Sequence, residues 1–186
     1  MFEGAKHTPT IVAAPEVKDR LITCVAATKT FNLAGAHVGA CVTSNPDFKA
    51  RLDQRIAASS LASYNAFGMI ATEAAWRTGE AWLDELLPYL QANRDLLHQG
   101  ICEAVPGARA MPLDATYLAW LDFNGTGLAA DDVAGRMKER ARIFASPGPQ
   151  FGPGGENRLR FNFATPRSRI NEAIERIGDA FADVRT

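Results

Sequence analysis

Residues 26–39 read AATKTFNLAGAHVG, and they place one lysine, Lys29, between a short apolar run and a glycine-rich turn. The flanking runs, RLITCV at 20–25 and VGACVT at 38–43, are rich in β-branched residues, which predicts two short buried strands. An apolar setting disfavours the ammonium form of lysine, and the neutral amine is the form that attacks carbonyl carbons. A solvated loop lysine is the alternative, and it is the commoner case for a single lysine.

Composition narrows the class of protein. The chain has 186 residues, enough for one or two domains with a real core, and its 47% hydrophobic and 22% charged content is that of a globular protein. A formal net charge of −1 gives no basic surface for nucleic acid or anionic membrane. Since no segment has the length of a membrane span and residues 1–17 lack the apolar core of a signal peptide, we expect a cytoplasmic protein without nucleic-acid or membrane partners.

The cysteines and histidines give no metal site. Cys24, Cys41 and Cys102 have no metal-ligand spacing, and we expect them to be reduced, mostly buried thiols of an intracellular protein. The three histidines have no cysteine or histidine at ligand spacing. We therefore predict no metal.

Helix and strand patterns alternate along the rest of the chain. Residues 1–18 are expected to be irregular, and Pro88 is expected to kink or divide the long helix that contains it. From residue 81 the order is helix, strand, helix, strand, strand, helix, which predicts an α/β sandwich with helices on one small sheet. The predicted helices are 45 onward, 61–77, 81–105, 131–140 and 168 onward, and the predicted strands after residue 43 are 117–123, 142–145 and 158–164, with a Gly/Pro loop at 146–155.

A second group of polar residues lies at 158–168, RLRFNFATPRS. A planar guanidinium such as that of Arg160 can bind a carboxylate through two parallel hydrogen bonds, and its charge does not titrate away. The alternative is a strand arginine paired with an acidic side chain, which is the more common arrangement for one arginine considered alone.

Taken together, these segments resemble the class I/II aminotransferase superfamily of pyridoxal-phosphate (PLP) enzymes. The run TKTFNLAG is most similar to the branch of cystathionine β-lyases and related C–S lyases, and the 82–97, 115–123, 147–160 and 158–168 segments also resemble that branch. The residues of the lysine segment that match are Thr28, Lys29, Asn32, Leu33, Gly35, Val38 and Gly39. His37 stands where many members have the arginine that contacts the cofactor phosphate, an arginine that the C–S lyase branch commonly lacks.

The resemblance implies roles for five of these residues. Lys29 would carry PLP as a Schiff base and act as the catalytic base, with Thr28 and His37 as further cofactor contacts. Arg160 would bind the substrate α-carboxylate, and Asn32 would also contact the substrate. Lys29 and Arg160 are then expected to face one cleft.

The implied fold is the carboxyl-terminal part of a fold type I PLP-dependent transferase. Residues 1–80 would be a fragment of the large PLP-binding domain, and residues 81–186 would be the small α/β sandwich domain, beginning with the interdomain helix. A whole member of the family is about twice as long, and its first half supplies the aspartate that pairs with the pyridine nitrogen. Residues 1–80 are therefore expected to present a broad apolar surface.

Three functions remain open from the sequence. The first is an aminotransferase or C–S β-lyase that acts on a small amino acid as a homodimer, with the 186 residues having little activity alone. The second is a non-catalytic fragment or association module that needs a partner half. The third is a small-molecule binder unrelated to PLP, which the five matching segments disfavour.

Overall fold

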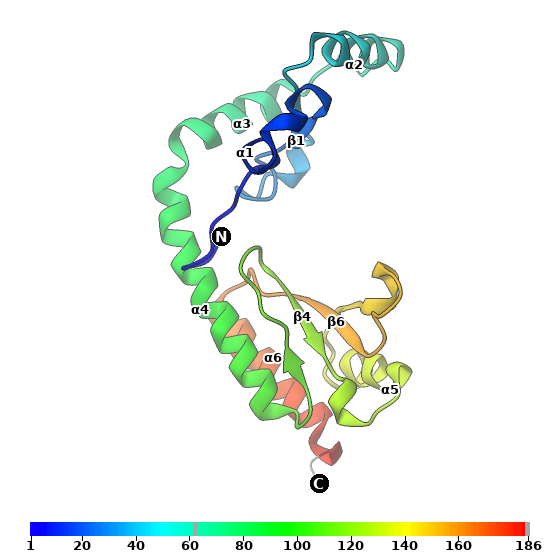
Figure 1. The fold of residues 1–186 in the computed structure, drawn as a ribbon. Coiled ribbons are helices and arrows are strands. Elements are labelled where there is room, and N and C mark those ends of the chain that lie inside the picture. Colours follow the sequence, from blue (N-terminus) through cyan, green and yellow to red (C-terminus); the bar gives the residue numbers. More distant parts are fainter. Residues whose placement is uncertain (62, 185–186) are drawn as a thin grey trace. The chain divides into compact units, whose positions relative to one another are not determined.

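The computed structural model describes residues 1–61 and 63–184, which form two compact units (Figure 1). We call Lys6–Leu86 the lysine unit and Met1–Ala5 together with Leu87–Thr186 the arginine unit. The division between them lies inside one long helix. The assignment of residues 1–80 and 81–186 to two domains of the aminotransferase fold stays a prediction.

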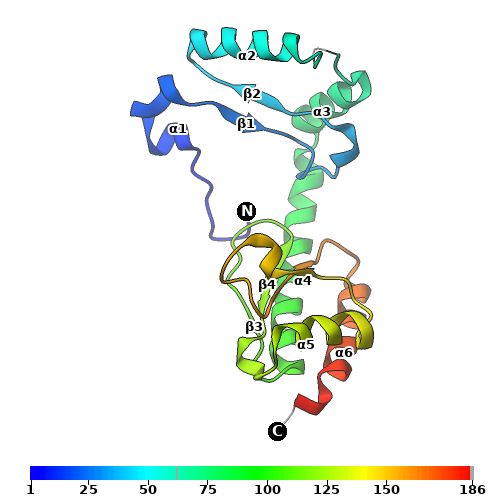
Figure 2. The same cartoon turned by 90° about the vertical axis from the view of Figure 1, so that its right-hand side faces the viewer.

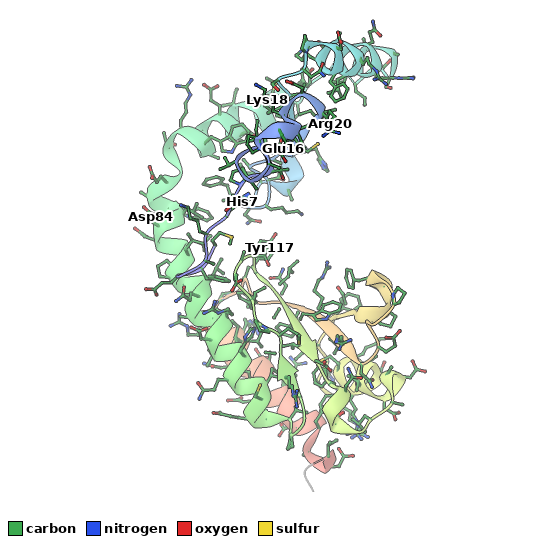
Figure 3. All side chains as sticks on the ribbon, in the orientation of Figure 1. His7, Glu16, Lys18, Arg20, Asp84 and Tyr117 are labelled. Atoms are coloured by element: carbon green, nitrogen blue, oxygen red, sulfur yellow. The ribbon has the colours of Figure 1, made fainter. Side chains whose placement is uncertain are left out.

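The lysine unit is built from short elements around a two-stranded sheet. Strands β1 and β2 pair antiparallel and run side by side in Figure 2. A 3₁₀ turn over Pro15–Arg20 carries Glu16, Lys18 and Arg20, whose side chains Figure 3 labels. The elements are α1 Thr10–Ala13, β1 Thr23–Val25, a 3₁₀ turn Ala34–Ala36, β2 Ala40–Val42, α2 Pro46–Ala58 and α3 Ala66–Thr78.

The expectation of two buried strands in this unit is wrong in part. Both strands are shorter than predicted, and every residue of β1 and β2 is exposed. Within the described residues each strand pairs only with the other. Because successive side chains of a strand point to opposite faces and all of them are exposed, both faces of the sheet are open. Ala27 is the one hydrophobic residue of the described lysine unit that is buried, while α3 exposes Phe67 (85% exposed), Ile70 and Trp76. This agrees with the predicted apolar surface.

Helix starts in the lysine unit follow their capping residues. The Asn45 side chain accepts hydrogen bonds from the backbone of Asp47 and Phe48, so α2 begins at Pro46 as expected. Helix α3 begins after Asn65, whose side chain accepts from the Gly68 N–H, and not at Leu61 as the apolar pattern predicted. Ala62, inside that predicted helix, lies outside the described residues.

One helix, α4 Glu80–Ala104, continues through Pro88. The proline therefore does not divide it in two, because the neighbouring turns supply enough hydrogen bonds to keep it helical. Leu90, Leu97 and Ile101 form its buried stripe, together with Asn93.

The arginine unit contains a four-stranded antiparallel sheet of order β3-β4-β6-β5. The strands are β3 Arg109–Ala110, β4 Leu118–Asp122, β5 Ser146–Pro147 and β6 Arg158–Asn162. The remaining elements are 3₁₀ turns at Asn124–Thr126, Gly148–Phe151 and Ala182–Val184, helix α5 Ala130–Gly135, which continues as a π-helical turn Arg136–Arg140, and helix α6 Arg167–Ala180. The predicted strand at 142–145 is wrong: Arg142 has a positive φ of 54°, which breaks extended backbone, and the strand forms at Ser146 instead.

The core of the arginine unit lies between the sheet and helices α4 and α6. Ile170, Ile177 and Phe181 are buried, as the spacing of apolar residues along α6 predicts. Phe123 stacks on Phe181 with ring centroids 5.5 Å apart. The largest other buried side chains are Leu97, Ile101, Leu121, Met137, Phe163, Val105, Val133 and Asn93.

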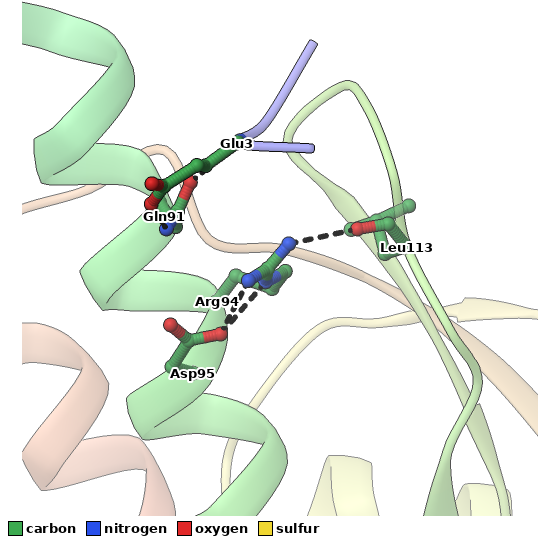
Figure 4. A network of polar contacts seen from close by, with 5 residues as sticks. All are labelled: Glu3, Gln91, Arg94, Asp95 and Leu113. Carbon is green, nitrogen blue, oxygen red and sulfur yellow. Dashed lines mark hydrogen bonds and ion pairs between the residues drawn. The ribbon is translucent and has the colours of Figure 1, made fainter. Parts of the chain in front are cut away.

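Residues 1–9 contain no helix or strand, as expected, whereas α1 and the 3₁₀ turn that begins at Pro15 correct the expectation of irregular chain up to residue 18. Phe2 is buried, and its ring lies 6.4 Å from that of Phe163, so the chain start is anchored in the arginine unit. The backbone N–H of Glu3 donates to Gln91 at 2.9 Å, and Figure 4 shows the neighbouring network around Arg94. Arg94 donates to the Leu113 carbonyl at 3.0 Å and pairs with Asp95.

The Ile174 side chain of α6 packs directly against Gly100 of α4. A Cβ added there would meet the Ile174 side chain at 2.5 Å, whereas a Cβ on Gly135 of α5 would meet nothing within 4 Å. We predict that Gly100→Ala destabilises the arginine unit by about 1 kcal/mol, because overpacking outweighs the gain in helix propensity. Gly135→Ala is the matched control and should stabilise it by about 0.5–1 kcal/mol. Chemical denaturation of both variants measures this, and equal effects would contradict the close approach.

The last turn of the chain is held by an ion pair. The Arg136 guanidinium hydrogen-bonds the Asp183 carboxylate and lowers the pKa of that carboxyl from 3.8 to about 2. Because the folded pKa is depressed, the contribution to stability is present above the unfolded pKa and is lost as pH falls through the folded one.

We therefore predict that Asp183→Asn lowers the melting temperature at neutral pH and that the difference from the parent shrinks as pH falls from about 4 to about 2. Melting curves of both proteins across that range provide the measurement. A difference that stays constant with pH would show that the carboxylate charge is not what stabilises this turn.

Candidate functional site

The Lys29 loop connects β1 to β2, and its conformation is held by apolar contacts and by backbone hydrogen bonds. Ala27 is 1% exposed, and its carbonyl accepts from Phe31 N–H at 3.0 Å, while the Thr28 carbonyl accepts from Leu33 N–H at 2.8 Å. Phe31 stacks in a tilted arrangement on Trp82, with ring centroids 5.9 Å apart. These contacts turn the chain so that residues 28–32 project as one turn.

Helix α3 supports the second half of the loop. The Asn65 side chain donates to the Ala36 carbonyl at 3.0 Å, and a Cβ added to Gly68 would lie 2.6 Å from the same oxygen and 2.7 Å from Val38. Only glycine allows this approach. Neither Asn65 nor Gly68 was identified from the sequence. Asn65 could have been found, because asparagine is a preferred capping residue at the start of a helix.

Lys29 itself is exposed on this turn. In the described part of the chain, no carboxylate lies within ion-pairing distance of its amine. The apolar, desolvating setting expected from the sequence is not found around it, because the two-stranded sheet beside it is uncovered. What the structure provides is an exposed, unpaired primary amine on a turn whose backbone is held by hydrogen bonds.

The other predicted residues of this loop lie close to Lys29 in the chain but differ in setting. Thr28 is half-buried, whereas Asn32 and His37 are exposed. Asn32 has φ 53° and His37 has φ 51°, the left-handed conformation that reverses the chain direction at each point. The loop therefore brings a hydroxyl, an amide and an imidazole into one segment with the Lys29 amine.

Arg160 lies on β6, in the arginine unit, directly opposite Trp120 of β4 and Ser146 of β5. Its guanidinium donates to the Ser146 hydroxyl at 3.3 Å and lies 4.6 Å from the centre of the Phe151 ring. Phe151 meets Trp120 edge-on, with centroids 5.5 Å apart. Arg160 is half-buried and has no acidic partner among the described residues.

Arg158, two positions earlier on the same strand, has a different setting. It forms an ion pair with Asp122 at 3.0 Å. Burial raises the pKa of Asp122, but hydrogen bonds from Asn124 and the charge of Arg158 outweigh this and leave the pKa below its usual value. The strand therefore contains one arginine satisfied by an acid and one available to a carboxylate from outside.

We predict that these two arginines differ in what they contribute to stability. Arg158→Ala should cost about 1–2 kcal/mol, because it leaves the largely buried Asp122 without its counter-charge. Arg160→Ala should cost only about 0.5 kcal/mol, since it loses one long hydrogen bond and a cation–π contact. Denaturation of the two variants measures both values, and a larger loss for Arg160→Ala would indicate a structural role.

Two further predictions concern groups outside this site. The expectation of mostly buried cysteines is wrong, because Cys24, Cys41 and Cys102 are all exposed free thiols: two lie on the uncovered sheet and one on the outer face of α4.

Within residues 1–61 and 63–184 there is no cluster of histidine, cysteine or acidic side chains that could hold a metal ion. Nor does any described helix have the length and apolar character to cross a membrane.

The two functional segments lie in different units, Lys29 in the lysine unit and Arg160 in the arginine unit. The model of the family "Aminotransferase class I and II" matches residues 1–177 of the chain. The chain belongs to that family.

Two curated relatives show the range of named activities in the family. The chain is 33% identical to cystathionine beta-lyase PatB of Bacillus subtilis over 98% of its own length and 47% of the relative's. It is 27% identical to an aspartate aminotransferase of Pyrococcus horikoshii, over 97% of this chain and 45% of that one. The chain thus spans about half the length of the curated relatives it matches.

A solved structure gives the same assignment for the fold. Cystalysin from Treponema denticola, whose crystal structure contains a pyridoxal 5'-phosphate cofactor, covers 100% of this chain at 29% identity with a TM-score of 0.93. This chain covers 47% of cystalysin. The α/β fold of this aminotransferase family, present in part, is therefore confirmed.

Proposed function

We propose that the chain provides the cofactor-binding lysine and the carboxylate-binding arginine of a PLP-dependent enzyme that acts on amino acids, of the C–S β-lyase or aminotransferase type. The observation that carries this proposal is the setting of Arg160. It is half-buried beside Trp120 and Phe151 and has no acidic partner among the described residues, unlike Arg158. An unpaired, half-buried guanidinium is suited to an anionic ligand.

The residues of the lysine loop fit the chemistry of PLP. An exposed amine without an ion-pair partner can react with the cofactor aldehyde, and Thr28 and His37 supply hydrogen-bond donors that suit its phosphate. When bound, PLP supplies an electron sink for the electrons left on the substrate Cα.

In this proposal each protein residue has a separate task. Arg160 binds the substrate α-carboxylate and fixes which Cα bond is presented, while the Phe151 ring, which meets Trp120 edge-on, packs against its guanidinium. Asn32 contacts the substrate from the lysine loop. The Lys29 amine would hold the cofactor and would take the proton from the substrate Cα. A reaction of the C–S β-lyase type would expel a thiol from the substrate Cβ, and a reaction of the aminotransferase type would not.

We further propose that the 186 residues alone have little lyase or aminotransferase activity. We also propose that the active species is a larger, cytoplasmic homodimer. The uncovered sheet of the lysine unit and the coverage of about half of each relative support this. The chain has no described residue assigned to the pyridine nitrogen. Loss of one such electrostatic contact typically costs a hundred- to a thousandfold in rate, roughly.

The experiment is an assay of cystathionine cleavage and of amino-acid transamination by the purified chain with saturating PLP. We expect rates at least about a hundredfold below ordinary enzyme turnover. Turnover at ordinary rates that disappears in Lys29→Ala would show that the chain is a complete enzyme. A PLP-dependent rate that is the same in Lys29→Ala would contradict the assignment of the lysine.

A second candidate function is an association module without catalysis. The apolar side chains exposed along α3, Phe67, Ile70 and Trp76, favour it, because surfaces of that kind drive association. Light scattering of the chain separates the two functions when combined with PLP absorbance. A chain that assembles but forms no adduct with PLP would be an association module.

A further inference from the structure

Two cysteines of the lysine unit face each other across the two-stranded sheet. Cys24 of β1 and Cys41 of β2 are direct partners in the antiparallel register, although 17 residues separate them in sequence. Their sulfur atoms lie 3.7 Å apart, and both thiols are free and exposed. Neither cysteine belongs to the Lys29 loop contacts or to the Arg160 site.

The backbone of this pair already meets the requirement for a disulfide. Opposite residues of an antiparallel pair have Cα atoms about 4.5–5.5 Å apart, and disulfides join Cα atoms about 4.4–6.8 Å apart. The two sulfurs need to approach from 3.7 Å to about 2.0 Å, which side-chain rotation can provide. No movement of β1 relative to β2 is required.

The hydrogen bond with Cys24, followed by the charge of that neighbour, raises the pKa of the Cys41 thiol. A shift of this kind is expected for two thiols close enough to interact, in agreement with the 3.7 Å between their sulfur atoms.

We propose that Cys24 and Cys41 form a dithiol site that undergoes exchange with small-molecule disulfides and closes as a reversible intramolecular disulfide. The inference is independent of the proposed function. In the first step one of the two cysteine thiolates attacks one sulfur of the small disulfide, whose S–S bond breaks and releases one thiolate. In the second step the other cysteine thiolate attacks the protein sulfur of that mixed disulfide, forms the Cys24–Cys41 bond and expels the second thiolate. The protein loses two electrons and two protons, and the small disulfide becomes two thiols.

The closed form would cross-link both ends of the segment that carries Lys29. Val25 and Ala40, the last paired residues before the loop, are adjacent to the two cysteines. A bond at this position restricts the loop ends to the geometry of the sheet. The dithiol thereby links the redox state of the surroundings to the order of the Lys29 turn.

The test is to incubate the full chain with glutathione disulfide, block the remaining thiols, digest with trypsin without reductant and identify the peptides by mass spectrometry. Trypsin cuts after Arg20, Lys29 and Lys49, so the two cysteines fall in the separate peptides 21–29 and 30–49. We expect these two peptides from one chain to be joined and to separate on reduction, while Cys102 carries only glutathione. Glutathione on each cysteine separately, or links between chains or to Cys102, would overturn the proposal.

The matched control moves the sulfur by one residue along β1. The double variant Cys24→Ser, Val25→Cys keeps the same number of cysteines in the same tryptic peptides, but side chains alternate between faces of a strand, so the new sulfur points to the opposite face from Cys41. At the same concentration of glutathione disulfide, we expect the yield of the disulfide-linked peptides 21–29 and 30–49 to fall at least about tenfold. Since both altered positions are exposed, the circular dichroism spectrum should not change. An equal yield of the linked peptides from this variant would show that the disulfide forms by random collision of the cysteines and does not depend on the pairing of β1 with β2.

Discussion

Replacing Lys29 with alanine is expected to abolish the covalent adduct between this chain and PLP. The amine lies exposed on a turn fixed by Ala27, Phe31 and helix α3, and none of the described acidic side chains pairs with it. An exposed primary amine without a counter-ion, on a turn whose backbone is hydrogen-bonded, is a reactive group that the cofactor aldehyde can use.

The measurement is the visible absorbance of the chain with PLP, before and after reduction with borohydride. Lys29→Ala should lower the reducible adduct at least about tenfold, because the remaining lysines react only as scattered surface amines. Lys18→Ala is the control, since Lys18 is also exposed in the lysine unit and should keep the parent signal. Equal loss in both variants would mean that PLP reacts with the chain without selectivity.

Replacing Asn93 with alanine is expected to cost the arginine unit about 3 kcal/mol of unfolding free energy, since buried polar groups left without partners are expensive. Asn93 is fully buried on α4. Its side-chain amide donates to the carbonyl oxygens of Phe163 and Thr165, at 3.3 and 2.9 Å, and its oxygen accepts from Arg167. The variant leaves the Thr165 carbonyl and the side-chain Nε–H of Arg167 without this partner, while the Phe163 carbonyl keeps its hydrogen bond from the Thr165 N–H.

This asparagine fixes the chain just after β6, the strand that carries Arg160. Denaturation of the variant gives the free energy, and Asn171→Ala on α6 is the control, since Asn171 is exposed and should change stability by less than about 0.5 kcal/mol. A loss below about 1 kcal/mol for Asn93→Ala would show that water replaces the side chain at no great cost.

The sequence predicted most reliably those features that depend on local patterns. Apolar spacing along α6 predicts its buried face, because a helix that packs on a sheet repeats its core residues every three to four positions. The capping side chain of Asn45 predicts the start of α2. The family assignment came from ordered short motifs, and the match over residues 1–177 confirms it.

Features that depend on tertiary partners were not predictable from the residues. The β-branched residues at 20–25 and 38–43 are typical of buried strands, but burial also needs neighbouring elements, and every residue of β1 and β2 is exposed in the described chain. The exposure of Cys24 and Cys41 has the same cause. Phe2 lies in irregular chain as expected, but its burial beside Phe163 depends on a contact between residues far apart in sequence and no local pattern predicts it.

The candidate site was predictable in its residue types and not in its contacts. Arg160 could be selected from its motif, but its difference from Arg158 depends on which strand neighbour carries an acid, and only the register β4–β6 places Asp122 opposite Arg158. The shared cleft of Lys29 and Arg160 stays a prediction. So do the roles of Thr28, Asn32 and His37.

The central claim, that Lys29 is the residue to which PLP attaches, is tested most directly by locating the reduced adduct. The chain is incubated with PLP, reduced with borohydride, digested with trypsin and mapped by mass spectrometry. A modified lysine resists trypsin, so we predict one pyridoxyl peptide spanning residues 21–49, uncut at Lys29. A pyridoxyl label spread evenly over Lys6, Lys18, Lys29, Lys49 and Lys138, with residues 21–29 and 30–49 still released as separate peptides, would contradict the claim.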